Sequence, residues 1–518
     1  MPPLRFPASL REWSRATCLV LLAVLGMSAW FPAQVINSDS VNGFLAWKGA
    51  QLSGQYNTVA EIDLRDASRL STRFLSWWTP GQYQAPAALQ RVTGLPLSYA
   101  IGACNALCMA LGLLGFHALF RRCALPPGPR LAALLLIATS ATVTGRFIIY
   151  MGGESLNFAL FPWLLLGLTY FNSPAAAALY ALAAVLLGFW AKSQMLIALP
   201  AALVAQILAT LPQRRDGRRL LAVIGGILVA GLIAYFGYLR VTATPASAAI
   251  AESHRAGLRL NPLVFLAPLA APSLVIGNLG DLLNSPAAYA RGGLRLLSYS
   301  LLAAAVIASM TCAWRSAPGP RRDFARFVVL YWLINAAIFL ALEALRAPVG
   351  VLARHVKLLG FLWFPVLAWQ IAACLPSARR RGLGLALGGL LVTGVLLNHA
   401  RLVAIWSRHS SVSSQGLRLQ SLRDMPAPLS AFLHAQDGGP TTFVFSNYED
   451  RWSIDTASMH PQQLRPDLCL SGRGPRLIAI YPNSNGESDA TAAAARQFPA
   501  YQITRQIPLA GHFLVFLK

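Results

Sequence analysis

The sequence predicts a polytopic α-helical membrane protein that ends in a small α/β domain. Only 12% of its 518 residues are charged and 56% are hydrophobic, whereas a soluble domain carries about 25% charged residues. Apolar runs of about 20 residues, the length of a helix that crosses a bilayer, recur up to about residue 405. Beyond that point the chain is more polar and alternates β-like runs with helix-like sequence.

The apolar runs predict about eleven transmembrane helices. They cover residues 17–33, 96–120, 129–149, 155–171, 175–191, 194–211, 220–240, 295–313, 325–344, 356–375 and 382–405. The first run follows three arginines but lacks a small-residue cleavage site, which indicates a retained helix rather than a signal peptide. A further apolar stretch lies within 262–280. As a full span it would move the arginines at 321–322 to the opposite side, so we expect a re-entrant or interfacial segment.

Positive charge predicts the orientation of these helices. The net charge is +24, and short arginine clusters stand between apolar runs at 121–130, 214–219, 315–326 and 379–381. With a cytoplasmic N-terminus, all four clusters fall on the cytoplasmic side, as the positive-inside rule requires. This pattern favours topology signals over nucleic-acid binding. We therefore expect a multi-pass membrane protein with a cytoplasmic N-terminus and an extracytoplasmic C-terminus.

Two domains are expected from this topology. Residues 1–405 form the transmembrane domain, which includes a long outer loop at 34–95, and residues 406–518 form a soluble extracytoplasmic domain. The expected strands of the soluble domain are Thr441–Phe445, Leu477–Tyr481, Tyr501–Ile507 and His512–Leu517, with a helix around Ala490–Arg496. The seven cysteines form no CxxC pair, so neither a zinc site nor a disulfide framework is indicated.

Two acids lie at the predicted outer boundary of the membrane. Asp39 follows the first apolar run by a few residues, and Glu154 stands where the third and fourth helices meet. Ionisable groups at such positions are typical of functional sites. Helix capping is the structural alternative for both residues. A divalent cation held between the two carboxylates is a further alternative that the residues leave open, and the metal requirement is unknown.

The four lysines, Lys48, Lys192, Lys357 and Lys518, all fall on the predicted outer side, against the usual charge bias. Snorkelling anchors at the interface are one explanation. The functional alternative is an anionic ligand such as a lipid phosphate, which ammonium and guanidinium groups bind well.

Aromatic residues are concentrated in the outer loop, at 77–83. Trp78 and Tyr83 fit either the aromatic belt of the interface or a platform on which a sugar ring stacks. We take Lys48, Trp78, Tyr83 and His355 as candidate substrate contacts. The sequence contains no P-loop, HExxH, GxSxG or dinucleotide-binding motif.

Together these features resemble the GT-C membrane glycosyltransferases, in particular bacterial relatives of protein O-mannosyltransferases and aminoarabinose transferases. Asp39 matches the family's acid after the first helix, and residues 46–50 resemble the short helix that follows it. Glu154 matches the acid at the start of the fourth helix, and Lys192 ends a Gly-containing fifth helix as in the family. Arg354-His355 matches the Arg-aromatic pair before a late helix. The chain departs from the family at Ser40, where a second acid is common, and at His355, where tyrosine is usual.

The resemblance implies an inverting transfer of a sugar from a polyprenyl-phosphate carrier to an extracytoplasmic glycan, lipid or protein. It implies that Asp39 acts as general base and that Glu154 orients the acceptor or holds a cation. Lys192 and Arg354, with Lys357 close by, would neutralise the departing phosphate. The alternatives are a lipid or solute transporter and a non-catalytic component of an envelope assembly. Internal symmetry is typical of transporters, and we detect none in this sequence.

Overall fold

The structure of the protein is a computed structural model. The described residues are 35–36, 43–44, 47, 57–62, 70–74, 79–140, 143, 149–150, 153–214, 217–239, 262–276, 279, 283, 292–316, 320–344, 353–374, 382, 418–419, 427–435, 442–445, 476–482, 487–509 and 511–518. The first predicted transmembrane run and all but one residue of the last lie outside these ranges, as do Asp39, Lys48 and Trp78.

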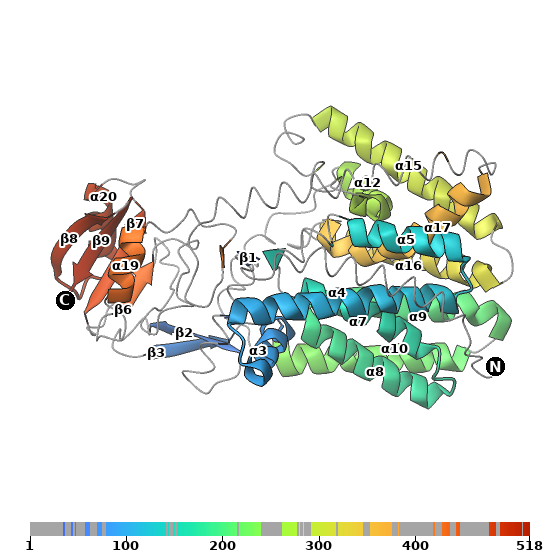
Figure 1. Ribbon diagram of the computed structural model, residues 1–518, viewed down its shortest axis with the longest axis horizontal. Coiled ribbons are helices and arrows are strands. Elements are labelled where there is room, and N and C mark those ends of the chain that lie inside the picture. The colour runs from blue at the N-terminus through green and yellow to red at the C-terminus, as the bar shows by residue number, and fades with distance from the viewer. Residues whose placement is uncertain are drawn as a thin grey trace. The chain divides into compact units, whose positions relative to one another are not determined.

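Helices occupy each of the nine predicted runs that the structure describes (Figure 1). They are α4 (Leu97–Arg122), α5 (Pro127–Thr139), α7 (Glu154–Leu168), α8 (Pro174–Ala191), α9 (Met195–Arg214), α10 (Gly217–Ala234, continued by the π-helical turn Tyr235–Leu239), α15 (Gly292–Ser316), α16 (Pro320–Ala344) and α17 (Ala353–Cys374). Among the described residues, six helices are long and apolar enough to cross a membrane, namely α4, α8, α10, α15, α16 and α17. The predicted helical membrane fold is thus confirmed, while the number of eleven spans stays a prediction.

The stretch at 262–280 forms α12 (Pro262–Ala270) followed by the 3-10 helix η3 (Ala271–Val275). Their 14 residues reach about 21 Å as an ideal α-helix, less than the ~30 Å hydrocarbon core. α12 packs against α15 and α16, and η3 packs against α17. Within its described residues this segment is therefore too short for a straight transmembrane helix, and its re-entrant or interfacial character stays a prediction.

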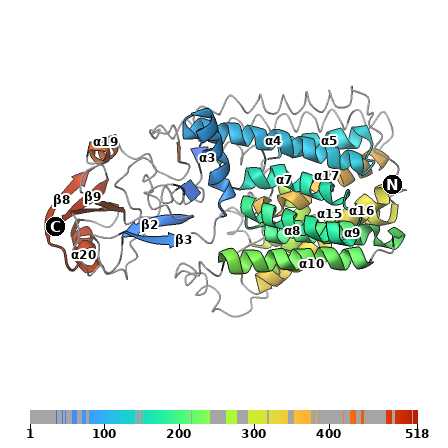
Figure 2. The ribbon, with the colours of Figure 1, turned by 90° about the horizontal axis from the view of Figure 1, so that it is seen from below.

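Small residues let α8 and α10 pack closely along each other (Figure 2). Gly226, Ala230 and Ala234 recur every fourth residue on α10 and are buried. A Cβ atom on Gly226 would lie 2.3 Å from the backbone oxygen of Ala178 on α8. The opposite side of α10 exposes leucines, with Leu221 70% accessible. Such small-residue contacts are typical of membrane helices, where dispersion replaces the hydrophobic effect as the source of association.

A cluster of aromatic rings joins α4, α7 and α17 in the interior of the bundle. The ring of Phe116 lies 5.6 Å from that of Phe158 and 5.8 Å from that of Phe361, and the last two rings are 5.7 Å apart. All three side chains are nearly inaccessible to solvent. Tilted and edge-on rings at these separations attract one another beyond their buried area. This cluster holds the start of α7 beside α17, and both helices contribute to the site described below.

The chain divides into two compact units. The first comprises Met1–Phe31, Gly102–Ile148 and Gly153–Val403, and the second comprises Pro32–Ile101, Ile149–Gly152 and Ala404–Lys518. The second unit therefore includes the outer loop, and the expected division into domains at about residue 405 stays a prediction. Within the second unit, β1 (Val35–Ile36) pairs in parallel with β4 (Ile149–Tyr150) and β5 (Arg418–Leu419). The unit also contains the hairpin β2–β3 (Thr58–Ile62, Leu70–Phe74) and α3 (Gly81–Thr93), none of which was predicted.

The C-terminal region forms the predicted small α/β domain. Its four strands are β6 (Thr442–Phe445), β7 (Leu477–Pro482), β8 (Ile503–Leu509) and β9 (His512–Leu517), in the sheet order β6-β7-β9-β8. Alternate residues of β7 and β9 face opposite sides of the sheet. Leu477 and Val515 pack with α20 (Glu487–Gln497), whereas Ile478 and Leu514 pack with α19 (Ala427–Ala435).

The contact between α8 and α10 can be tested with two neighbouring glycines. Gly226→Ala should destabilise the protein by roughly 1–3 kcal/mol, because the new methyl group meets backbone that has to move. At Gly225, by contrast, no atom of another described segment lies within 4 Å of the added carbon. Gly225→Ala should therefore leave stability unchanged or raise it, since alanine favours the helix. Thermal melting of both variants in detergent measures the difference, and equal melting temperatures would contradict the packing described.

Candidate functional site

The candidate site is a group of charged side chains at the N-terminal end of α7. A close backbone contact brings its parts together, because a Cβ atom on Gly153 would lie 2.2 Å from the backbone oxygen of Ala191. Gly153 immediately precedes Glu154, and Ala191 immediately precedes Lys192. Only a residue without a side chain permits this approach, which sets the start of α7 beside the end of α8.

Three charges meet in this position. The Lys192 ammonium group pairs with Oε1 of Glu154, and the Lys357 ammonium group pairs with Oε2. Lys357 Nζ also lies 3.5 Å from the backbone oxygen of Glu154. The Glu154 and Lys357 side chains are 2% and 3% accessible, whereas Lys192 is 20% accessible. The carboxylate is thus enclosed by two cations, and the three groups carry a formal charge of +1.

The turn between α8 and α9 presents Lys192 and links the cluster to α17. Lys192 adopts an extended backbone conformation where α8 ends, and its N–H donates to Gly188 O at 2.9 Å. Its carbonyl oxygen accepts from Met195 N–H at 2.9 Å, which starts α9. The Gln194 side-chain amide donates to the backbone oxygen of His355, two residues before Lys357.

Next to the charges lie buried polar groups that sequence reasoning missed. Asn157 is fully buried one turn after Glu154, and neither its amide nitrogen nor its amide oxygen has a hydrogen-bond partner among the described residues. Ser155 donates to Asn105 Oδ1 on α4 at 2.6 Å. The signal available in the sequence was an asparagine three residues after an acid, in a helix that is apolar beyond this first turn.

The structure brings together some predicted site residues and separates others. Glu154, Lys192 and Lys357 form one cluster, and His355 lies beside it through its backbone. Arg354 belongs to the first turn of α17. Tyr83 lies in the other compact unit, where it is 3% accessible and donates to Asn57 Oδ1 at 2.6 Å. Its role as a substrate contact stays a prediction, as do the roles of Asp39, Lys48 and Trp78, which lie outside the described residues.

The arrangement of Glu154 does not suit a divalent cation in this state. Both carboxylate oxygens are paired with ammonium groups, and a metal ion would have to displace one of them. Within the described ranges, no group of three or more His, Cys, Asp or Glu side chains is arranged as a metal site. Chemically, the cluster is a lysine with a partly exposed side chain whose ammonium group is held in place by a buried counter-charge, and such a group is suited to binding an anion.

Comparison with known proteins reveals a likeness of fold. No family model matches the sequence, and no curated protein matches it. Among solved structures, ArnT from Cupriavidus metallidurans bound to undecaprenyl phosphate is similar over 98% of this chain and 98% of its own, with a TM-score of 0.56 and 14% identity. The arabinofuranosyltransferase AftD from Mycobacteria aligns with 99% of this chain and 40% of its own, at 15% identity and a TM-score of 0.46, which is too low for an argument. The likeness to ArnT confirms the predicted fold, a helical membrane bundle similar to that of ArnT.

Proposed function

We propose that this protein is a membrane glycosyltransferase that transfers a sugar from a polyprenyl-phosphate carrier to an acceptor outside the cytoplasm. The observation that carries the proposal is the pair of lysines on Glu154 at one end of the bundle. Its support is the shared fold with ArnT, whose structure contains undecaprenyl phosphate. The acceptor classes are an envelope glycan, a lipid or a protein, and the compartment is the bacterial inner membrane.

In this proposal Lys192 binds the phosphate of the donor. Its side chain is the most accessible of the three, whereas the Lys357 side chain is almost completely buried. An ammonium group has three N–H donors, so Lys192 can keep its bond to Glu154 while it donates to a phosphate oxygen. Glu154 holds Lys192 in position, and Lys357 balances the charge of Glu154.

The reaction follows from general chemistry. Asp39 accepts the proton of the acceptor hydroxyl group as general base. The acceptor oxygen attacks the anomeric carbon, the bond from that carbon to the phosphate oxygen breaks, and the configuration inverts. The electron pair of the broken bond leaves with the polyprenyl phosphate. Lys192, assisted by Arg354, stabilises the negative charge that grows on this phosphate, which lowers the barrier because the charge is greater in the transition state.

Lys192→Met should reduce sugar transfer about 10²–10³-fold, the usual loss for a group that stabilises developing charge. Methionine retains most of the aliphatic stem, and Lys357 remains as a counter-charge for Glu154. Transfer from a panel of synthetic polyprenyl-phosphate monosaccharides in liposomes measures the effect. Lys518→Met, which removes the same charge at the C-terminus, serves as the matched control and should change transfer less than threefold. Equal effects of the two variants would assign Lys192 to interface anchoring.

Asp39→Asn should lower turnover roughly 10²–10⁴-fold while protein yield and donor binding persist, because asparagine keeps the shape but cannot accept the proton. A capping role predicts a different result, since asparagine caps helices about as well as aspartate does. Single-turnover transfer by the purified variant separates these roles. Near-normal turnover would remove Asp39 from the mechanism.

Glu154→Gln should destabilise the protein strongly, by about 3–5 kcal/mol, because it leaves the buried Lys357 ammonium group without a counter-charge. The double variant Glu154→Gln/Lys357→Met removes both buried charges and should recover most of the lost stability. It should not recover sugar transfer, since Lys192 then lacks its positioning carboxylate. The melting temperature and the rate of sugar transfer of both variants test this expectation. A Glu154→Gln variant as stable as the wild type would refute the buried pairing.

A further inference from the structure

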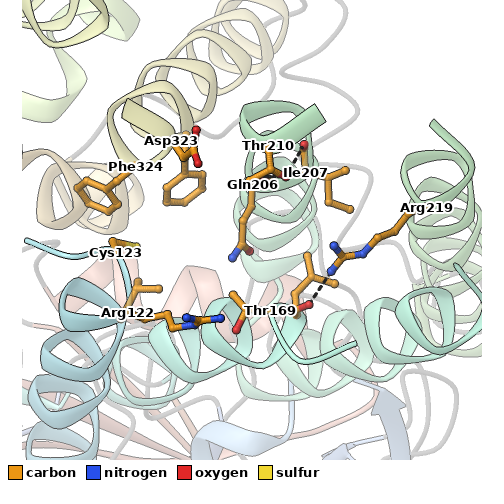
Figure 3. A pocket seen from close by; sticks show the side chains of 12 residues that line it. Arg122, Cys123, Thr169, Gln206, Ile207, Thr210, Arg219, Asp323 and Phe324 are labelled. Atoms are coloured by element: carbon orange, nitrogen blue, oxygen red, sulfur yellow. Dashed lines mark hydrogen bonds between the residues drawn. The ribbon is translucent and has the colours of Figure 1, made fainter. Parts of the chain in front are cut away.

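A polar cavity lies at the other end of α7. It measures about 250 Å³ and is bordered by α4, α7, α9, α10 and α16 (Figure 3). Its polar lining residues are Arg122, Thr169, Gln206, Thr210, Arg219 and Asp323. A single ordered water needs only about 10–15 Å³ by the same kind of measure. The space therefore suits a larger group than one water molecule.

This cavity is separate from the proposed donor site. Glu154 begins α7, whereas Leu168, which lines the cavity, ends it. Fifteen helical residues span roughly 22 Å, most of the thickness of a hydrocarbon core. The cavity also lies at the end of the bundle where the arginine clusters of α4, α10 and α16 gather. The positive-inside rule predicts that this end is cytoplasmic.

The two arginines that line the cavity differ in their hydrogen bonds to the protein. Arg219 is 6% accessible, and its Nη2 donates to Leu168 O at 2.8 Å (Figure 3). It thereby satisfies a terminal carbonyl group of α7 and opposes the negative end of the helix dipole. Arg122 is exposed, and its guanidinium group has no hydrogen bond or ion pair to any residue in the part of the chain that the structure describes. Arg122 is therefore the cation available to a ligand.

Acceptor groups line the same space. Gln206 donates through Nε2 to Leu165 O at 3.2 Å, while its buried Oε1 has no partner among the described residues. The Asp323 carboxylate, in the first turn of α16, also lines the cavity. The Thr169 hydroxyl group donates to Leu166 O at 2.7 Å and retains acceptor capacity. The buried Gln206 Oε1 in particular favours a ligand that donates hydrogen bonds as well as carrying negative charge.

The rest of the lining is apolar. Leu119, Leu168, Ile207, Phe324 and Phe327 surround the polar groups. A cationic and hydrogen-bonding cavity with apolar walls, at the end of a transmembrane bundle, fits a lipid headgroup better than a free metabolite. We propose that this cavity binds a phosphate ester whose headgroup carries hydroxyl groups, supplied by an anionic phospholipid of the leaflet on the arginine-rich side. Arg122 contacts the phosphate, and Gln206 Oε1 and Asp323 accept from the hydroxyl groups.

The experiment titrates the purified full-length protein in detergent with three probes. They are dihexanoyl phosphatidylglycerol, dihexanoyl phosphatidylcholine and glycerol 1-phosphate, and the readout is the rise in melting temperature with ligand concentration. Phosphatidylglycerol should raise the melting temperature of the wild type, and phosphatidylcholine should do so much less. A weak response to glycerol 1-phosphate assigns the ligand to the membrane. A response as strong as that to the lipid supports the phosphate site and assigns a soluble source.

Two variants test whether this cavity is responsible. Arg122→Gln should raise the Kd for phosphatidylglycerol about tenfold or more, because a charge-assisted hydrogen bond is lost. Arg218→Gln is the matched control, since it removes the same charge from an exposed residue at the same end that does not line the cavity. It should change the Kd less than threefold, and the donor site is intact in both variants. Equal weakening by the two variants, or equal binding of phosphatidylcholine and phosphatidylglycerol, would overturn the proposal.

Discussion

The burial of Glu154, which is only 2% accessible, is the constraint on which the arrangement of the described bundle depends. Burying one charge in a medium of low dielectric constant is very costly unless opposite charge lies beside it. Glu154 therefore requires Lys192 and Lys357, which come from the end of α8 and from α17. The aromatic cluster of Phe116, Phe158 and Phe361 holds α7 against α17 so that this pairing is maintained.

The two ends of α7 are stabilised by side chains of opposite charge. At its N-terminus an acid begins the helix, which the helix dipole favours, and two ammonium groups balance it. At its C-terminus Arg219 caps Leu168 O. Charged side chains from other segments thus contact both ends of α7. The helix therefore connects the proposed donor site with the polar cavity at its C-terminal end. Its interior is apolar except for Ser155 and Asn157, which lie within one turn of Glu154.

Glycine contacts determine how close the helices come. At Gly153 and Gly226, an added Cβ atom would meet the backbone of a neighbouring segment at 2.2 Å and 2.3 Å. A backbone atom cannot rotate away as the end of a side chain can, so these contacts fix the spacing between segments. In the candidate site this spacing has a direct chemical consequence, because it sets the distance over which Lys192 has to reach Glu154.

The sequence by itself determined the long helices of the described bundle and the strands of the C-terminal sheet. Apolar runs of bilayer length predicted the helices, alternating runs predicted β6 to β9, and the order of acids and lysines marked Glu154, Lys192 and Lys357 as candidates. These signals are local, so they can be read along the chain. The pairing of both lysines with one carboxylate, the burial that distinguishes Lys357 from Lys192, and the grouping of the outer loop with the C-terminal region were decided by the tertiary structure. The reason is that each depends on contacts between residues tens to hundreds of positions apart, such as Glu154 with Lys357, and no local pattern specifies which distant segment will lie alongside.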